Sequence, residues 1–352
     1  MANQTEHAVR IDPDRLRTFA SDVFGRAGLS EEHADIVADT LVDANLRGID
    51  THGVVRLEPY VERLEEGGIN ASPEPSVSQS GGAGAAIVNG DDGPGQVATL
   101  RAMEEAIDRA SDNGSAFVGV RNSNHFGTAS YYTNYATERG YVGIAMTHAG
   151  PNVTPFGGAD PYFGTNPISF GLPNGDDFPI TLDMATSVTA KGNVILAEEE
   201  GEDIPSDWAV DEEGNPTTDP AEFHALRPMA GPKGYGLAFV IDAFCGVLMD
   251  TVFGDDVPTM YHDVSSPQKL GHFVGAVDVE SFTSLGGFAD RMQQMVDDLK
   301  ELRTAEDFGE VLVPGEPEAR TKAERLEDGV PLGEGVWDTL QTLGAQYHVQ
   351  LE

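Results

Sequence analysis

R-N-S-N-H-F-G (residues 121–127) opens the part of the chain that decides the fold, and I-T-L-D-M-A-T-S (residues 180–187) closes it. Four apolar runs in or next to this part are typical of strands: residues 116–120, 142–146, 168–172 and 180–182. Polar segments rich in Gly, Pro, Asn and Thr follow these runs, and two of them carry His125 and Asp183. Because binding and catalytic groups often lie on loops held by a rigid sheet, we predict that this part forms the floor and walls of an active site.

Helices are predicted on both sides of this sheet region. Asp12 followed by Pro13 favours a helix start, because Asp is a good N-cap and Pro suits the first helical position. Ser30 is the predicted N-cap of a second helix. Two C-terminal helices are expected at residues 317–328 and 335–345, packed against the opening helices. We therefore predict a helical domain from residues 1–75 joined by 317–352, and an α/β domain from residues 76–316.

The α/β domain contains further predicted elements. We expect strands at residues 85–88, 273–279 and 311–316, and helices at residues 94–110, 233–248 and 285–302. Residues 233–248 are apolar on most faces of a helix, which indicates a buried central helix. Residues 70–84 are rich in Pro, Ser and Gly and predict a domain boundary, and residues 197–228 predict a long, acidic and irregular excursion.

The charge balance is far from neutral. The 352 residues include 59 acidic and 21 basic side chains, for a formal net charge of −38. Such a surface repels nucleic acids and anionic membranes, which excludes those partners. Its self-repulsion destabilises a compact fold unless salt screens it, so we predict a protein from a salt-loving cell. An ordinary acidic enzyme from a mesophile is the alternative.

Cysteine content and hydrophobicity predict the compartment. The single cysteine, Cys245, excludes an intrachain disulfide and suits a reducing cytoplasm. The sequence contains no run of about 18 apolar residues, so it predicts no transmembrane helix. Residues 1–10 lack the apolar region of a secretory signal. We therefore expect a cytoplasmic protein.

Two histidines and an arginine are candidate catalytic groups. His125 follows a predicted strand, and His52 precedes a predicted helix that carries Arg56 in its first turn. An imidazole exchanges protons near neutral pH, and a guanidinium binds a carboxylate through two hydrogen bonds. The alternatives are a loop histidine bonded to the backbone, a capping histidine and a surface arginine. His148, directly after another strand, is a weaker candidate for the same site.

Three other segments are candidate ligand contacts. Asp183 follows an apolar strand, where a buried carboxylate is costly unless paired, so it is expected to orient a histidine or a ligand group, or else to cap a following helix. Lys233 lies in G-P-K-G-Y-G (231–236) at a predicted helix N-terminus, which favours anions. P-G-E (314–316) is a second candidate, with a plain turn as the alternative.

Several common signatures are absent from the sequence. Gly81–Gly84 precedes a strand and does not open a helix, so it is not a Rossmann dinucleotide-binding fingerprint. No H-E-x-x-H motif, cysteine cluster or G-x-S-x-G elbow is present. Two other classes stay open on the residues alone. One is a non-catalytic ligand-binding protein, and the other is a metal-assisted hydrolase or lyase with the ligands His52, His125, His148 and Asp183.

Seven motifs in one order resemble a known family. They are R-G-I-D-T-H-G-V-V-R-L (47–57), N-S-N-H-F-G (122–127), P-F-G-G (155–158), G-T-N-P (164–167), L-D-M-A-T-S (182–187), G-P-K-G-Y-G (231–236) and P-G-E (314–316). Together they resemble the malate/L-lactate dehydrogenase family, which is unrelated to Rossmann dehydrogenases and includes ureidoglycolate and sulfolactate enzymes. Residues 204–220 and 224–237 are most similar to ureidoglycolate dehydrogenases, whereas Phe126 after His125 is more similar to the malate and lactate members.

The resemblance implies a fold and an activity. The fold is α/β, of the non-Rossmann malate/L-lactate dehydrogenase-like type, with a helical domain built from both chain ends and an α/β cofactor-binding domain. The activity is hydride transfer to NAD or NADP from a small 2-hydroxy acid of the ureidoglycolate, malate or lactate type, which gives the 2-oxo acid. The resemblance also implies a homodimer or higher homo-oligomer without a bound metal.

The resemblance assigns site residues as well. His125 and His52 match catalytic histidines, and we expect His125 to take the hydroxyl proton while His52 assists. Arg56 matches a contact to the substrate carboxylate. The positions that match cofactor contacts are Asp183, Met184, Ala185, Pro232, Lys233, Pro314, Gly315 and Glu316, with Ala149 as a weaker match.

Overall fold

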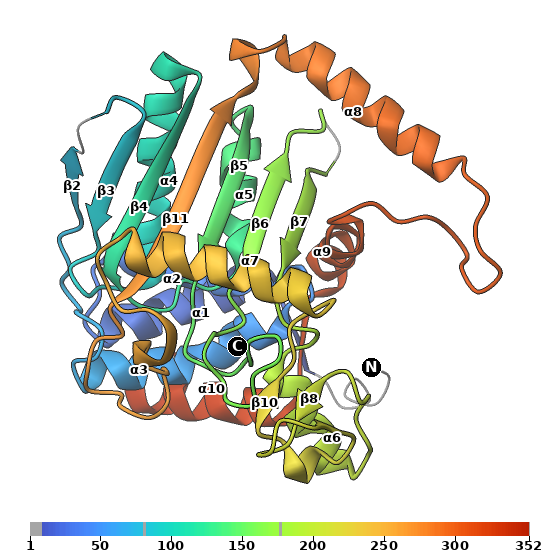
Figure 1. The fold of residues 1–352 in the computed structure, drawn as a ribbon. Helices are drawn as coiled ribbons and strands as arrows, with labels where there is room; N and C mark the ends of the chain where they lie inside the picture. Colours follow the sequence, from blue (N-terminus) through green and yellow to red (C-terminus); the bar gives the residue numbers. More distant parts are fainter. Residues whose placement is uncertain (1–8, 80–81, 176–177, 352) are drawn as a thin grey trace.

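The described residues fold around a seven-stranded sheet (Figure 1). The computed structural model describes residues 9–79, 82–175 and 178–351, so positions 1–8 of the predicted helical domain and Gly81 of the glycine run lie outside them. In the order of hydrogen-bonded neighbours, the strands are β2 (Ser76–Gln79), β3 (Ala85–Asn89), β4 (Ser115–Ser123), β11 (Leu270–Asp278), β5 (Tyr141–Thr147), β6 (Ile168–Leu172) and β7 (Ile180–Met184).

Strand direction separates this sheet from the parallel Rossmann type. Within the described sheet only β3 and β4 run parallel, and every other neighbouring pair is antiparallel. β11, from late in the chain, inserts between β4 and β5. The insertion brings the segment before β11 next to the end of β4, where the loop with His125 begins. The predicted α/β fold of a non-Rossmann type is confirmed.

Two helices cover one face of the sheet. α4 (Gly95–Asn113) and α5 (Ala129–Thr137) pack on the central strands. α4 turns a row of small side chains toward the sheet at helical spacing, so the helix approaches closely: Ala98, Ala102, Ala106 and Ala110. Gly114 ends α4 in the left-handed region, with φ of 78°, and turns the chain into β4.

The two chain ends form a helical layer at one end of the sheet (Figure 1). Its helices are α1 (Pro13–Arg26), α2 (Glu31–Leu46), α3 (Leu57–Glu65), α9 (Glu316–Asp328) and α10 (Glu334–Tyr347). A hydrophobic core joins side chains between Ile11 and Ile69 with others between Val330 and Leu351. β1 (Val9–Ile11) pairs with β12 (Val330–Leu332), which ties the two ends together.

Both predicted N-caps of this layer are confirmed. Asp12 Oδ1 accepts from the N–H groups of Asp14 (3.1 Å) and Arg15 (3.0 Å), and Ser30 Oγ accepts from His33 N (3.2 Å). These bonds satisfy backbone donors that the first helical turn leaves unpaired. The start of each of these helices could therefore be predicted from a single side chain.

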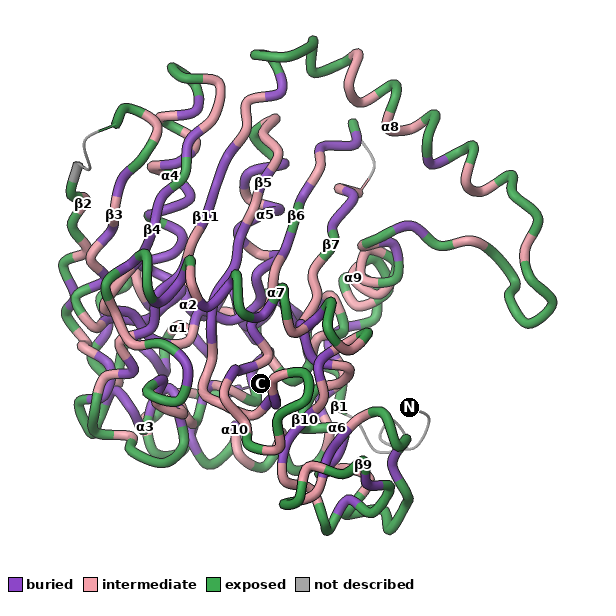
Figure 2. Tube along the Cα trace, viewed as in Figure 1, coloured by how far each residue is buried: buried purple, intermediate pink, exposed green. Residues whose placement is uncertain are grey.

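The predicted helix at residues 233–248 is confirmed, but the prediction that it is buried was wrong. α7 spans Pro232–Asp242 and continues as a π-helical turn, η4 (Ala243–Val247). Ile241 and Cys245 pack on the sheet with Met146. Apolar side chains elsewhere on this segment are exposed: Leu237, Phe239, Val240, Phe244, Val247 and Leu248. The segment crosses the sheet face opposite α4 and α5 as an outer layer, so only one side of it is covered (Figures 1 and 2).

Three other segments differ from the predictions. The predicted strand at residues 311–316 does not form, because Pro314 and Gly315 make a turn and α9 begins at Glu316. β2 lies inside the predicted boundary and pairs with β3. Residues 197–228 are not irregular throughout. They contain the end of α6 (Lys191–Glu200) and a small sheet of β8 (Ala209–Val210), β9 (Pro216–Thr217) and β10 (Ala225–Leu226), whose strands are too short to show alternation.

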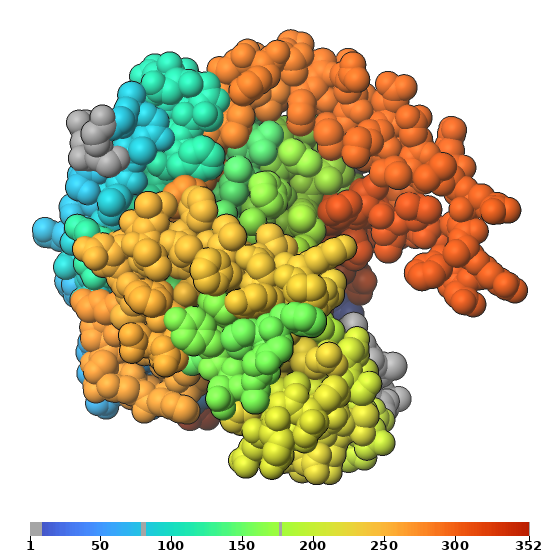
Figure 3. Space-filling model, in the orientation of Figure 1, coloured from blue at the N-terminus to red at the C-terminus, as the bar shows by residue number. Residues whose placement is uncertain are grey.

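α8 (Leu285–Lys300) confirms the predicted helix, and its Val296 packs with Ile180 at the start of β7 (Figure 1). The chain returns from it to α9 as an arm that projects from the body (Figure 3). Several apolar side chains along this segment are exposed: Phe282, Leu285, Met295, Leu302 and Phe308. Neither α8 nor any other helix in the described residues combines the length and apolar content needed to cross a membrane.

Candidate active site

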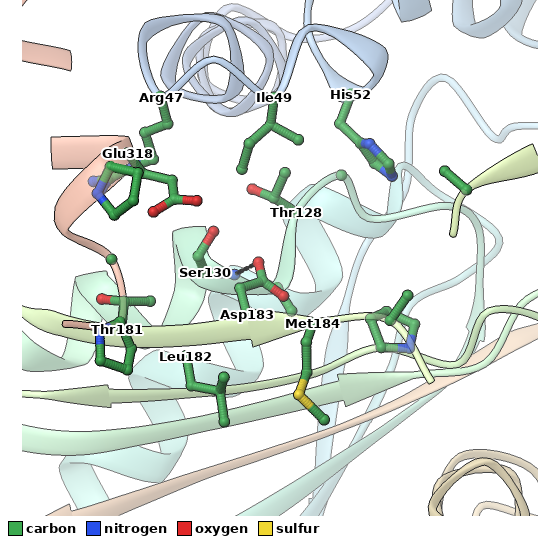
Figure 4. A pocket seen from close by; sticks show the side chains of 18 of the residues that line it. Arg47, Ile49, His52, Thr128, Ser130, Thr181, Leu182, Asp183, Met184 and Glu318 are labelled. Atoms are coloured by element: carbon green, nitrogen blue, oxygen red, sulfur yellow. Dashed lines mark hydrogen bonds between the residues drawn. The ribbon is translucent and has the colours of Figure 1, made fainter. Parts of the chain in front are cut away.

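A cavity of about 610 Å³ lies where the helical layer meets the edge strand β7. Its walls come from the end of α2, the turn η1 (Asp50–His52), the loop before α5, β7 and the start of α9 (Figure 4). Its lining includes Arg47, Ile49, His52, Thr128, Ser130, Thr181, Leu182, Asp183, Met184 and Glu318. Segments from the beginning, middle and end of the chain meet here, so the cavity exists only in the folded chain.

Asn45 fixes the turn that carries His52. Its Oδ1 accepts from Val54 N (2.8 Å), and its Nδ2 donates to Asp50 Oδ1 (2.6 Å). Gly53 lies directly against this amide, because a Cβ at position 53 would be 2.2 Å from Asn45 Oδ1. Gly53 of the Thr-His-Gly motif is thus required by packing, and the turn that it permits brings His52 close to Arg56.

The imidazoles of His52 and His125 are stacked. Their ring centroids are 5.7 Å apart, and the ring planes differ by 28°. Burial lowers the pKa of His52 to about 4, and the charge of Arg56 adds to the shift. Burial also lowers the pKa of His125 well below its ordinary value, with smaller effects from His52, Arg56 and His272. Both imidazoles are therefore neutral at neutral pH, the state in which an imidazole accepts a proton.

Three contacts hold His125 in place. Its backbone N–H donates to Gln268 Oε1 (3.1 Å), the Tyr60 hydroxyl oxygen lies 2.6 Å from Nδ1, and Gly127 N–H donates to Nδ1 (3.3 Å). Sequence reasoning missed Tyr60 and Gln268. Tyr60 lies on the buried face of α3, and the need of a buried phenol for a hydrogen-bond partner was the available signal.

Arg56 has no acidic partner within ion-pair distance in the described part of the chain. Its Nε donates to Thr51 O (2.7 Å), Nη1 lies 3.8 Å from Met260 Sδ, and the guanidinium lies over the Tyr261 ring at 5.8 Å. The remaining N–H groups have no partner among the described residues. A guanidinium with free donors beside two neutral histidines is suited to bind an anionic ligand.

The buried side chain of Arg63 holds the segment that covers Arg56. Arg63 is 1% exposed and donates to five oxygens: Met260 O (3.3 Å), Asp263 O (2.9 Å), Ser266 O (2.8 Å), Gly68 O (3.3 Å) and Asn124 Oδ1 (3.3 Å). It thus joins α3 to the segment before β11 and to the loop of His125. Sequence reasoning missed it, although a charged side chain on a buried helix face is itself a signal.

Asp183, Met184 and Ala185 line the cavity from the side of β7. β7 extends to Met184, so Asp183 lies within the strand, and the alternative that it caps a following helix is wrong. Asp183 Oδ2 accepts from Ser130 N (2.7 Å) in the first turn of α5 (Figure 4). Burial raises the pKa of its carboxyl, and the bonds from Ser130 oppose that shift.

Pro314 and Gly315 line the cavity beside β7. Gly315 has φ of 85°, and a Cβ there would lie 3.0 Å from Thr181 N, so this turn requires glycine. Glu316 does not line the cavity. Its buried carboxylate instead binds Lys300 Nζ (2.6 Å) and accepts from Val313 N (3.0 Å), which stiffens the turn.

His125 and Arg56 do not line this cavity and adjoin it through His52. Four other candidates also lie outside it. Ala149, Pro232 and Lys233 do not line it, and Lys233 is exposed at the start of α7. His148 is buried, with Nδ1 3.1 Å from Asp242 Oδ1 and Nε2 accepting from Gly271 N (3.0 Å). The expectation that His148 lines the site is therefore wrong. Within residues 9–79, 82–175 and 178–351, no three His, Cys, Asp or Glu side chains converge as metal ligands.

The cavity has the chemistry of a site for an extended ligand with polar and apolar parts. Thr128 Oγ1 lines it and is buried without a hydrogen-bond partner among the described residues. An unpaired buried hydroxyl is costly, so a ligand that bonds it is favoured. Leu182 contributes apolar wall surface and is 39% exposed. The volume lies within the usual range for small-molecule sites.

Comparisons with known proteins agree with this architecture. The family model for malate/L-lactate dehydrogenase matches residues 11–341. Ureidoglycolate dehydrogenase (NAD(+)) of Escherichia coli strain K12 is 39% identical over 332 residues, which cover 94% of this chain and 95% of that protein. Malate dehydrogenase of Pyrococcus horikoshii is 38% identical over 355 residues, covering 98% and 97%. The crystal structure of malate dehydrogenase from Entamoeba histolytica has a TM-score of 0.92 at 29% identity, covering 98% of this chain and 99% of that one.

Fold, site and relatives define a class of protein, the oxidoreductases that act on hydroxy acids. The chain belongs to the malate/L-lactate dehydrogenase family, as its motifs indicated.

Proposed function

We propose that the protein is an NAD(P)-dependent dehydrogenase that oxidises a small 2-hydroxy acid to the 2-oxo acid. One observation carries the proposal: two stacked neutral histidines lie next to Arg56, which has no acidic partner in the described part of the chain. Oxidation of a hydroxyl needs a group that accepts its proton, and a neutral imidazole is such a group. A substrate carboxylate needs a cationic partner, which Arg56 provides.

The proposed roles follow from the contacts of each side chain. His125 exchanges the hydroxyl proton through Nε2, which has no protein partner among the described residues. Arg56 binds the C1 carboxylate, and His52 assists with a hydrogen bond from its neutral ring. Holding the substrate between these groups supplies much of the rate, because proton and hydride transfer both require close and aligned atoms.

Residues of the cavity fit a nicotinamide dinucleotide. We propose Asp183, Met184, Ala185, Pro314 and Gly315 as its contacts, because all five line the cavity. When bound, the oxidised nicotinamide supplies the hydride acceptor. Contacts from Ala149, Pro232, Lys233 and Glu316 are proposed from the resemblance alone. One relative is named for NAD(+), so NAD is the first cofactor to test and NADP the second.

The proposed substrate is of the ureidoglycolate, malate or lactate type. Relatives named for ureidoglycolate and for malate are 39% and 38% identical to this chain, so identity favours neither strongly. A spectrophotometric screen at about 2–3 M KCl, which such an acidic surface should need, tests the proposal. It pairs each acid, and sulfolactate, with NAD and with NADP and records the absorbance of the reduced nicotinamide.

The screen has three informative outcomes. A selective rise with ureidoglycolate identifies a ureidoglycolate dehydrogenase. A rise with malate or lactate identifies a more general 2-hydroxy acid dehydrogenase. No change with any acid, in either direction and with either cofactor, contradicts the proposed substrate class.

We also propose that the chain forms a homodimer or a higher homo-oligomer. α7 and η4 form part of the face shown in Figure 3 and carry exposed apolar side chains, as does the α8 arm. Large exposed apolar surfaces commonly mark protein interfaces. Light scattering in concentrated KCl tests this point: a mass near the 37.5 kDa of one chain contradicts it, and a multiple supports it.

The domain division and the cellular setting are proposals too. We propose a helical domain of residues 1–75 and 317–352 and an α/β domain of residues 76–316, which the separate hydrophobic cores support. We further propose a cytoplasmic protein of a salt-loving cell. The excess of acidic residues and the single buried cysteine support this proposal.

A further inference from the structure

The hydrogen bonds at His125 Nδ1 determine where its ring proton lies. Gly127 N–H points at Nδ1 with an N···N distance of 3.3 Å, and an amide N–H only donates. Nδ1 therefore carries a lone pair, and the Tyr60 hydroxyl, whose oxygen is 2.6 Å away, must donate as well. Because a neutral imidazole has one ring proton, that proton is on Nε2.

A buried amide lies behind Tyr60. Tyr60 is 3% exposed and Gln96 is 1% exposed, and the Gln96 amide opposes the rise that burial causes in the pKa of the Tyr60 hydroxyl. Gln96 Nε2 has no hydrogen-bond partner of good geometry among the described residues, so its N–H groups are available to the phenol oxygen. A contact of this kind leaves the phenol O–H free to donate to His125 Nδ1.

We propose that Tyr60 is a positioning residue that fixes His125 in the Nε2–H tautomer, so that the resting site offers a proton donor to the substrate. The proposal rests on the dehydrogenase function and deepens it. The form of the substrate that fits the resting site is the 2-oxo acid, because its carbonyl oxygen accepts from Nε2–H. For oxidation, the Tyr60 hydroxyl must rotate so that its oxygen accepts from Nδ1–H, which a phenol can do.

In the direction of reduction, the proton that His125 gives to the substrate is replaced by the proton of Tyr60. With a reduced nicotinamide bound as the hydride donor, the Nε2 proton would pass to the substrate oxygen and the Tyr60 proton would move to Nδ1. The imidazole stays neutral and Tyr60 becomes a phenolate. Burial raises the pKa of Tyr60 to about 12, against smaller opposing effects of Arg56 and Gln96, so the phenolate recovers its proton once the product leaves. Nε2 then takes a proton from solvent, and the Nδ1 proton returns to Tyr60.

The charged and titratable groups around His125 do not oppose this tautomer. Among the described residues they are His52, Arg56, Tyr60 and His272, from the turn η1, the turn η2 (Val54–Arg56), α3 and β11, and none of these is a carboxylate. A carboxylate at Nδ1 would favour the opposite tautomer by accepting Nδ1–H. His148 shows that case, because its Nε2 accepts from a backbone N–H and its Nδ1 faces Asp242.

Nuclear magnetic resonance tests the tautomer directly. Long-range proton–nitrogen spectra of the full chain with ¹⁵N-labelled histidine, without substrate or cofactor, distinguish Nε2–H from Nδ1–H rings. The His125 signals are assigned by their loss in His125→Gln. We expect the Nε2–H form in the wild type and a mixture of tautomers in Tyr60→Phe. The Nδ1–H signals of His148 report in each sample that the fold is intact.

Tyr131→Phe is the matched control. It removes another phenol hydrogen bond, from Tyr131 to Asp39 Oδ2 (2.7 Å), and should leave the His125 tautomer unchanged. In steady-state reduction of the 2-oxo acid, we expect Tyr60→Phe to lower kcat about 100-fold with KM little changed, and Tyr131→Phe to change neither.

The proposal and the proposed function fail in different ways. An Nδ1–H form of His125 in the wild type, or an Nε2–H form that persists unmixed in Tyr60→Phe, overturns the positioning role of Tyr60. The spectra require no turnover, so absence of activity with every acid tested would contradict the dehydrogenase function and leave the tautomer result standing.

Discussion

Arg56 has no carboxylate partner among the described residues, although the chain has 59 acidic and 21 basic side chains. We expect Arg56→Ala to raise KM for the hydroxy acid about 10- to 100-fold, because it removes charge-assisted hydrogen bonds to the substrate. The KM for the cofactor should change little. Arg139→Ala, which removes an exposed arginine stacked on Tyr135, is the control. An unchanged KM for the acid in Arg56→Ala would rule out the proposed carboxylate contact.

His272 is buried beneath the active-site loop. Its ring lies between Thr147 Oγ1 (2.7 Å) and Ser123 Oγ (2.9 Å) and stacks on Phe126. Burial lowers the pKa of His272 to about 3. The ring is neutral in the folded chain, whereas in the unfolded chain it has the ordinary pKa of histidine. The unfolded state therefore binds the proton first as the pH falls. Its contribution to stability is therefore complete above about pH 6.5 and is lost progressively toward pH 3.

This behaviour predicts a change in the pH dependence of stability. Between pH 6 and pH 4, the free energy of unfolding in urea should fall less steeply in His272→Gln than in the wild type, by up to about 1.4 kcal/mol per pH unit. Parallel curves for the two proteins would show that His272 does not couple folding to protonation. Constant KCl in all samples removes differences in screening.

At the scale of elements, α4 begins against the loop of His125. A Cβ at Gly95 would lie 2.1 Å from Asn124 O and 2.5 Å from His125 O. We expect Gly95→Ala to displace this loop and lower kcat about 100-fold, because small displacements of reacting groups have large effects on rate. Gly25→Ala in α1, where a Cβ meets nothing within 4 Å, should leave kcat unchanged. A wild-type kcat in Gly95→Ala would show that the loop tolerates the shift.

β11 is the element that completes the site. It comes from late in the chain and lies between β4 and β5, so the segment before it reaches the end of β4. There Gln268 holds the backbone of His125, and the carbonyls of the same segment accept from Arg63. The insertion of β11 thus positions both the proposed acid–base residue, His125, and the segment that covers Arg56.

The whole molecule carries a net charge of −38, and its stability should depend on salt. We expect the melting temperature to rise by more than about 10 °C between 0.1 and 2 M KCl, as screening removes repulsion between carboxylates. Differential scanning calorimetry at constant pH measures this change, and sucrose in place of KCl controls for solute exclusion. A melting temperature that does not depend on KCl would favour an ordinary acidic protein.

The sequence by itself determined the features that depend on neighbouring residues. N-caps at Asp12 and Ser30, helical periodicity and apolar runs located most described helices and the central strands within a few residues, because these signals act over one or two turns. The residue ranges of the helices α5 and α6 were not predicted. The ordered motifs indicated the family and the candidate side chains His52, Arg56, His125 and Asp183 for the same reason, since each motif is a short local pattern.

Only the tertiary structure determined which residues of these local patterns are in contact. Tyr60 and His125 are 65 residues apart, and His125 and Gln268 are 143 residues apart, so no local signal pairs them. The exposure of α7 likewise depends on its position as the outermost layer over the sheet, and an apolar helix has the same composition whether one side or both are covered. Chain topology brings distant polar groups together and leaves apolar faces uncovered, and topology is a property of the whole fold.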